Sequence, residues 1–197
     1  MHCKSRLVCL WLLCVLPCIG SAIQNQPPRK DPQSSFEPRS APGKGQQFLV
    51  RMEGQWDVEK TFHPRSGSPV RLKGTASQKM IHEGRFLQSD FSFESEGQVT
   101  TGTGLIGYEA EKDQFTSCWL DSRSTRFSFR KSQPPFNGVE IILFSENLGE
   151  ATKPRTRTVT KFDQNDQRLV HRQYAINADG SERLMMELIM NRAQKSK

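Results

Sequence analysis

Little in this sequence could brace a fold covalently or anchor it in a membrane. Four of its five cysteines, Cys3, Cys9, Cys14 and Cys18, lie before residue 23, which leaves Cys118 alone in the remainder. A single thiol makes no intramolecular disulfide, so core packing has to hold the fold together. The apolar run Leu7–Ile19 has 13 residues, against the roughly 20 that a membrane-spanning helix needs. We therefore expect no transmembrane span in the mature chain.

The first 22 residues have the order of a secretory signal peptide. Lys4 and Arg6 precede the apolar run, and a Gly-Ser-Ala sequence ending at Ala22 follows it. This order predicts cleavage after about Ala22 and a secreted or periplasmic protein. Lipid attachment at Cys18 is the disfavoured alternative, because Pro17 occupies a position where lipoprotein signals have a small residue.

The rest of the chain divides into a linker and one domain. Residues 23–47 contain five prolines and almost no apolar side chains, so this segment cannot bury enough surface to offset the entropy of ordering it. We expect a disordered Pro-rich linker there. Residues 48–197 are long enough for one domain with one hydrophobic core.

Within that domain the dominant period is two, which is typical of strands with one buried face. Short turns separate the segments, and Asp179-Gly180 is the clearest hairpin signal. The alternating segments are 50–62, 70–81, 85–93, 98–108, 114–121, 125–131, 139–144, 155–162, 167–176 and 181–191. We predict an all-β fold without helices: a single antiparallel up-and-down β-barrel of about ten strands, whose closure removes open sheet edges. A two-sheet sandwich is the alternative.

One motif invites a wrong functional interpretation. Gly102, Gly104 and Gly107 form a complete G-x-G-x-x-G, the pattern of a dinucleotide site in which a strand ends and a helix begins. Here the glycines lie inside a strand pattern, and a polar turn and another strand follow. Gly102 and Gly104 fall on one face, so we expect them to make room for a large side chain, with Phe115 and Trp119 of the next strand opposite.

The residues capable of chemistry are scattered. His63, His82 and His171 fall on different predicted strands or turns, without the spacing of a metal site. We predict no metal and no cofactor; a single-histidine haem site at an inward-facing His171 remains an alternative. Ser117, Cys118, Asp121 and Ser122 include possible nucleophiles, but none lies in a G-x-S-x-G elbow.

The arginines give no sign of a nucleic-acid partner. Their spacing on the predicted strands mostly directs them to solvent, with no aromatic platform beside them. The arginines concerned are Arg123, Arg126, Arg130, Arg155, Arg157, Arg168 and Arg172. In the segment 125–131 the alternation sets Phe127 and Phe129 against Arg126, Ser128 and Arg130.

A structural contact is expected where the barrel closes. The first and last strands meet in a closed barrel, so Arg192 could stack on Trp56, just after Gly54. Such a contact contributes roughly 0.5 to 2 kcal/mol.

These residues also carry a family resemblance. The motifs concerned are Gly54-x-Trp56, Gly84-Arg85-Phe86-Leu87, the central glycine motif with Tyr108, then Phe115, Trp119, Asp121 and Ser122, and finally Asp179-Gly180 with Arg192. Together they resemble the exported bacterial proteins grouped as domain of unknown function 1579. The resemblance covers about residues 48–192 and is loose between the central motif and the last hairpin, and Glu109 replaces the usual Asp. It implies a lipocalin-like barrel with no established activity and no catalytic residues.

These observations favour a non-catalytic binding module for a small apolar or amphipathic ligand, because barrels of this kind can enclose one. A structural or protein-interaction domain is the alternative. An enzyme would need convergent polar groups inside the barrel, and His171 and Tyr174, on opposite faces, are the only candidates. The sequence makes no prediction of oligomeric state.

Overall fold

The computed structural model describes residues 32–36, 39–146, 155–163 and 165–194, and the barrel lies in the compact unit that starts at Ser40. The expected signal peptide, residues 23–31 and 37–38 of the expected linker, and the loop 147–154 lie outside the described residues. The elements are α1 (Lys44–Val50), β1 (Gly54–Phe62), β2 (Val70–Ile81), β3 (Phe86–Ser95), β4 (Gln98–Glu109), β5 (Gln114–Asp121), β6 (Ser128–Lys131), β7 (Glu140–Glu146), β8 (Thr156–Asp163), β9 (Arg168–Ile176) and β10 (Glu182–Arg192).

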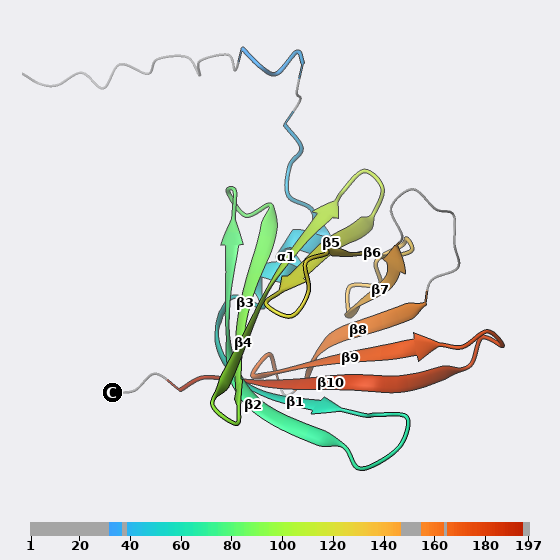
Figure 1. Cartoon of the computed structure of the whole chain (residues 1–197). Helices are drawn as coiled ribbons and strands as arrows, with labels where there is room; N and C mark the ends of the chain where they lie inside the picture. The colour runs from blue at the N-terminus through green and yellow to red at the C-terminus, as the bar shows by residue number, and fades with distance from the viewer. Residues whose placement is uncertain (1–31, 37–38, 147–154, 164, 195–197) are drawn as a thin grey trace, which may run out of the picture. The chain divides into compact units, whose positions relative to one another are not determined.

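The ten strands form one closed antiparallel barrel in which each strand pairs with its sequence neighbours and β1 pairs with β10 (Figure 1). The predicted barrel is therefore confirmed, and the sandwich is wrong. Two strands, 70–81 and 114–121, have the predicted bounds, and the other eight differ by a few residues at their ends. Closure runs through the register that places Trp56 beside Arg192.

The prediction of a fold without helices is wrong at one place. Residues 44–50 form α1, which begins within the expected linker, and the first strand begins at Gly54 instead of residue 50. Phe48 and Leu49 on this helix are buried, so tertiary packing stabilises a helix that is too short to be stable alone. Gly45 permits the close approach, because a Cβ there would lie 2.2 Å from Cγ of Tyr108.

The barrel interior changes character along its axis. At the end covered by α1, the inward side chains are fully enclosed and form a packed layer that we call the floor; its members include Leu49, Trp56, Leu87, Phe115, Ile141, Leu169 and Met190. Toward the opposite end, where the β1–β2 and β9–β10 turns lie, many inward side chains are only half-buried, although Phe93 and Thr158 are buried. The barrel is thus closed at one end by packing and open at the other.

The central glycines lie within β4, as expected for a strand and not for a nucleotide site. A Cβ on Gly102 would lie 2.3 Å from the Trp119 ring, and one on Gly104 would lie 3.4 Å from it. These glycines therefore make room for Trp119. The expectation that Phe115 also lies opposite them is wrong, because Phe115 pairs with Tyr108.

Strand β6 is turned relative to its sequence pattern. The register of β5 with β6 pairs Ser117 with Arg130, and Ser117 lies on the inward face of β5 with the enclosed Phe115. Arg130 therefore points into the barrel, and Phe129 points outward with Phe127, which is 59% exposed. The expectation that Arg130 faces solvent is wrong, because pairing with β5 overrides the apolar pattern of β6.

Candidate functional site

The Arg192 guanidinium stabilises the floor by stacking on Trp56 and by hydrogen bonds to the backbone. Its Cζ lies 4.4 Å from the centre of the Trp56 ring, the contact expected from the sequence. The guanidinium also donates to three carbonyl oxygens, those of Asp166 at 2.9 Å, Glu53 at 2.8 Å and Arg51 at 2.5 Å. Arg192 therefore ties β10 to the end of α1, the start of β1 and the β8–β9 turn. Gly54 has φ of 134°, a conformation that favours glycine.

Tyr108 anchors the other side of the helix. Its hydroxyl donates to the carboxylate of Asp113, which also pairs with Lys44 of α1 at 2.7 Å. Burial and the neighbouring Asp113 carboxylate raise the pKa of Tyr108 to about 12. Gln46 donates to the Tyr108 carbonyl at 2.8 Å. These bonds hold α1 across the barrel end, so Tyr108 has a structural position.

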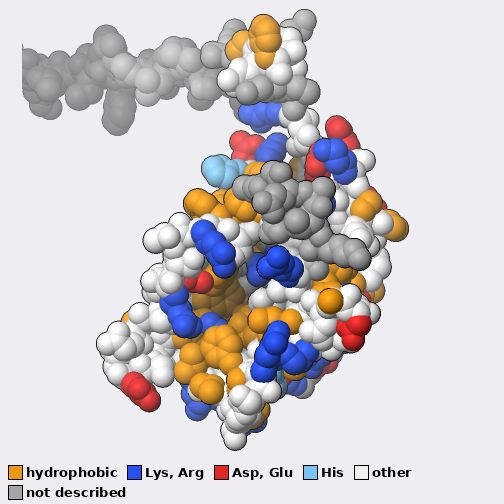
Figure 2. All heavy atoms as spheres, turned by 45° about the vertical axis from the view of Figure 1, so that its right-hand side comes forward, with side chains coloured by type: hydrophobic (Ala, Val, Ile, Leu, Met, Phe, Trp, Pro, Cys, Tyr) orange, Lys and Arg blue, Asp and Glu red, His pale blue; other side chains and the backbone are white. Residues whose placement is uncertain are grey.

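Above the floor is a hollow that we call the chamber. Figure 2, seen from the side on which the β1–β2 and β9–β10 turns lie in Figure 1, shows a depression with hydrophobic side chains at its base and Lys and Arg side chains around it. Inward residues at this level are half-buried: Phe62, Phe91, Ile106, Ser117, Trp119, Arg130, His171, Gln173 and Met186. Their retained accessible surface, against almost none for the floor, indicates space inside the barrel.

Two walls of the chamber differ in chemistry. On the β3–β5 side, Phe91 packs against Phe93 at 6.2 Å and against Trp119 at 5.7 Å between ring centres. On the β6–β9 side, the inward residues include Arg130, His171 and Gln173. One ligand could therefore meet an aromatic wall and a polar wall at once.

His171 lies on the polar wall, in register with Thr160. Its Nδ1 and the Thr160 hydroxyl are 2.7 Å apart. Burial, with a smaller effect of the Arg130 charge, lowers the pKa of His171 to about 4, so the ring is neutral at pH 7. His171 is half-buried on the inward face of β9 and lies at the level of the chamber.

Arg130 is the charged group of the polar wall. Its Nε is enclosed and has no hydrogen-bond partner, and no carboxylate among the described residues forms an ion pair with it. Burial lowers its pKa, but an arginine remains protonated in proteins. The chamber thus contains a poorly solvated cation without a counter-ion.

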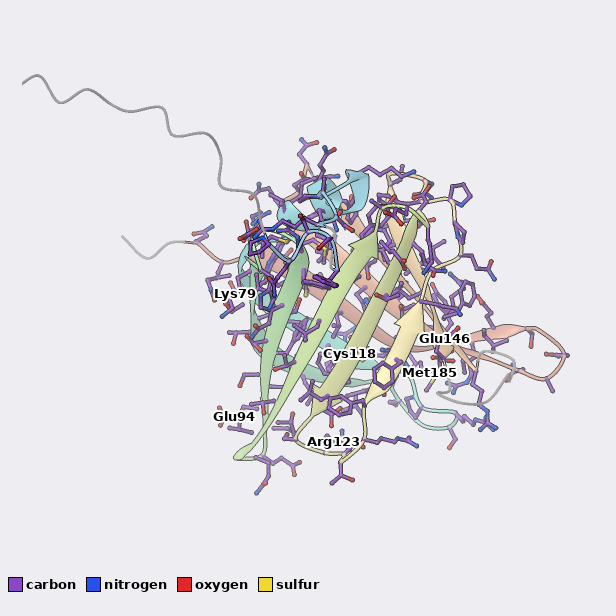
Figure 3. All side chains as sticks on the ribbon, turned by 90° about the horizontal axis from the view of Figure 1, so that it is seen from above. Lys79, Glu94, Cys118, Arg123, Glu146 and Met185 are labelled. Carbon is purple, nitrogen blue, oxygen red and sulfur yellow. The ribbon has the colours of Figure 1, made fainter. Side chains whose placement is uncertain are left out.

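Lys60 and Asp121 lie at the open end of the chamber. The Lys60 Nζ is 4.3 Å from the Phe93 ring centre and 4.8 Å from that of Phe62. Burial, and secondarily the charge of Arg123, lower the Lys60 pKa, while Asp121 opposes them. Figure 3 shows Arg123 and Glu94 together at this end, and Lys79 nearer the helix end.

The predicted chemical residues do not converge. His63 follows β1 and His82 follows β2, at opposite ends of the barrel, and only His171 lies inside. Tyr174 points outward, since it alternates with the inward His171 and Gln173. Within the described residues no group of three or more His, Cys, Asp or Glu could hold a metal ion. In the same residues, no helix has the length and hydrophobicity to cross a membrane.

Of the possible nucleophiles, Ser117 lies on the inward face of β5, and the other three have structural or outward positions. Asp121 accepts from Trp119 Nε1 and from the Arg123 backbone, each at 2.9 Å, as a cap at the strand end. Ser122 accepts from the Thr101 backbone at 3.1 Å. Cys118 is a free thiol on the outer face of β5 (Figure 3). Among the described residues, no hydrogen bond joins the Ser122 hydroxyl or the Cys118 thiol to a histidine or carboxylate side chain.

Two further hollows lie outside the chamber. The larger, of about 210 Å³, is lined by outward residues of β7–β9 that include Arg157, Lys161 and Arg172. Arg157 and Arg172 are already paired with Glu182 and Glu187. The smaller, of about 60 Å³, lies beside Phe136 near the helix end. The larger hollow is open, and neighbouring glutamates already neutralise two of its arginines. The other hollow is small. The chamber is therefore the stronger candidate for a ligand.

One residue in the sequence, Lys60, indicates polar groups inside the barrel. Trp56, Val58 and Phe62 share the inward face of β1, and Lys60 occupies the same series. A lysine at an inward position breaks the apolar series, and such breaks mark polar groups inside a barrel. The inward Arg130 gave no such signal, because its strand has an apolar series on the other face.

Two solved structures share this fold at 12% sequence identity. The crystal structure of Rv2717c from M. tuberculosis has a TM-score of 0.56, with 79% of this chain and 100% of that chain covered. The S-type phycobiliprotein lyase CPES from Guillardia theta has a TM-score of 0.52, with 78% and 94% covered. At this identity the likeness establishes the fold alone. A family model described as protein of unknown function (DUF1579) matches residues 41–192, and no curated protein matches the sequence.

Proposed function

This chain belongs to the DUF1579 family of proteins of unknown function, and from that premise we propose that it is an exported, non-catalytic binding protein whose chamber holds one small amphipathic ligand. Export is inferred from the first 22 residues, which lie outside the described residues. The binding function is inferred from the interior of the barrel.

The observation that carries the proposal is the contrast between floor and chamber. Leu87, Phe115 and Leu169 of the floor have no exposed surface, whereas inward residues one or two positions further along the same strands are half-buried. Together with the depression that Figure 2 shows, this difference supports a hollow above the floor. A closed floor beneath an open, partly apolar hollow is the form of a small-molecule site.

The polar groups in the chamber favour binding over catalysis. His171 and Thr160 form a base and hydroxyl pair at 2.7 Å, but the charge that acts on His171 is that of Arg130, not of an acid that would orient it as a general base. Asp121 is engaged by Trp119 and the Arg123 backbone. The S-type phycobiliprotein lyase shares the fold at 12% identity and does not supply a reaction for this chain.

The test uses N-phenyl-1-naphthylamine, an uncharged probe whose fluorescence rises in apolar surroundings. We expect saturable binding of one probe per protein. Ser117→Phe fills the chamber from β5 and should weaken binding about tenfold or more. Thr116→Phe adds the same ring to the exposed face of the same strand, so it is the matched control and should bind as the wild type does. Circular dichroism checks that both variants fold, because a larger side chain can cost about 1 to 3 kcal/mol.

Equal binding by the two variants would place the probe outside the chamber. An absence of saturable binding, together with no small molecule in mass spectra of the purified protein, would refute the proposal. The alternative, a structural or protein-interaction domain, would then be favoured.

A further inference from the structure

We propose that the chamber selects amphipathic carboxylates: a carboxylate head bound by Arg130, with the apolar body against the aromatic wall. This inference rests on the proposed function, because it names the ligand class of the same chamber.

The first argument is the position of Arg130. Register places it between Ser117 on β5 and Ser145 on β7, both inward. β1 lies directly across the barrel from β6 in the strand order, so Arg130 faces the chamber and not a neighbouring acid. An enclosed charge without a partner is unfavourable, and an anion placed beside it removes that penalty.

The second argument is the balance of charge inside the barrel. The inward positions of the strands above the floor carry three cations, Lys60, Arg130 and Arg183, and a single acid, Asp121. Asp121 acts on Lys60 at the open end. Arg183 donates to the His63 carbonyl at 2.9 Å. Among the described residues, Arg130 is the one of the three with neither an acid nor a carbonyl beside it, so the uncompensated charge lies at the polar wall.

The third argument is geometric. A guanidinium presents a planar fork that matches a carboxylate in two parallel hydrogen bonds, which a lysine cannot do. The other wall offers Phe91, which contacts both Phe93 and Trp119. The ligand that satisfies both walls has one negative charge at one end and an apolar body, and a small free anion satisfies only one wall.

The experiment displaces N-phenyl-1-naphthylamine from the full chain with three competitors: dodecanoate, dodecanol and acetate. Dodecanoate should compete at least tenfold better than dodecanol, and acetate should not compete. Arg130→Met should weaken dodecanoate by about 10- to 100-fold, the range for hydrogen bonds to a charged group, and leave dodecanol unchanged. Arg130→Lys should recover part of the loss. Arg126→Met removes an exposed arginine from the loop before β6 and should change nothing.

Each outcome of the displacement experiment either supports or overturns the carboxylate inference. Equal displacement by dodecanoate and dodecanol, or an equal response of both competitors to Arg130→Met, overturns the carboxylate inference and leaves the binding function standing. Competition by acetate alone identifies a small-anion site and also overturns it. If the probe itself does not bind, the proposed function fails, and the inference fails with it.

Discussion

Acidification should destabilise the protein through His171 in particular. The folded-state pKa of this ring is about 4, against 6.5 for an ordinary histidine, because the charged ring would be desolvated in the barrel. Between these two values the unfolded chain binds more protons than the folded chain. The free energy of unfolding therefore falls as pH falls through that window, and the contribution is fully present only above about pH 6.5.

The size of the effect follows from the two pKa values. At pH 5.0 the unfolded histidine is almost fully protonated, and the folded one is protonated in about a tenth of molecules, which corresponds to a loss of about 2 kcal/mol relative to pH 7.5. The full loss, approached below pH 4, is about 3 kcal/mol. This is a large part of the stability of an ordinary domain.

Urea unfolding at pH 7.5 and 5.0 measures the loss in the wild type and in His171→Gln, which keeps a polar group beside Thr160. Carboxylates with lowered pKa, such as Asp166 and Glu182, also lose stabilisation in acid, but they do so equally in both proteins and cancel. We expect the variant to lose about 2 kcal/mol less than the wild type. His82→Asn, on an exposed turn, is the control. Equal losses in wild type and His171→Gln would refute the dehydrated environment assigned to His171.

Two further predictions concern stability at neutral pH, measured as urea midpoints. Trp56→Ala should lower the free energy of unfolding by about 3 to 5 kcal/mol, because it removes a fully buried aromatic from the floor together with its contact to Arg192; an unchanged midpoint would contradict the role of this contact in closure. Arg130→Met should raise the free energy of unfolding by about 1 to 3 kcal/mol, since it removes an enclosed charge without a partner; a lower midpoint would show that Arg130 is stabilised by the fold itself.

The architecture was accessible from the sequence because alternation and turn chemistry agree over most of the chain. In β2, Leu72, Gly74 and Ala76 alternate with charged or hydroxyl residues, and Gly67 and Gly84 at positive φ lie in the turns on either side. With that many alternating segments, closure follows from the need to protect the edges. The Trp56–Arg192 contact followed from closure, since it needs only the pairing of the first and last strands.

The chamber was not accessible in the same way. The direction of Arg130 depends on which residue of β5 lies beside it, and β6 has only four residues with aromatics on one face. The alternation of aromatic and polar residues in β6 favoured Phe129 inside the barrel, whereas the pairing of β6 with β5 places it outside. Helix α1 was missed for a related reason: its seven residues contain Gly45 and two glutamines, and only the fit of Phe48 and Leu49 onto the barrel end makes them helical.

The pairing of β1 with β10 also means that the barrel can close only after the whole domain has been synthesised. Trp56 cannot meet Arg192 until the last strand has been synthesised, so no shorter nascent chain has a closed barrel, and the contacts that close it span most of the sequence. The other nine ladders join strands that are neighbours in the sequence, so we expect the β1–β10 pairing, which has the longest loop to close, to form last. For a chain that is exported as proposed, this delay keeps the polypeptide unfolded while it is threaded through a membrane, and the ligand chamber comes into being only on the far side.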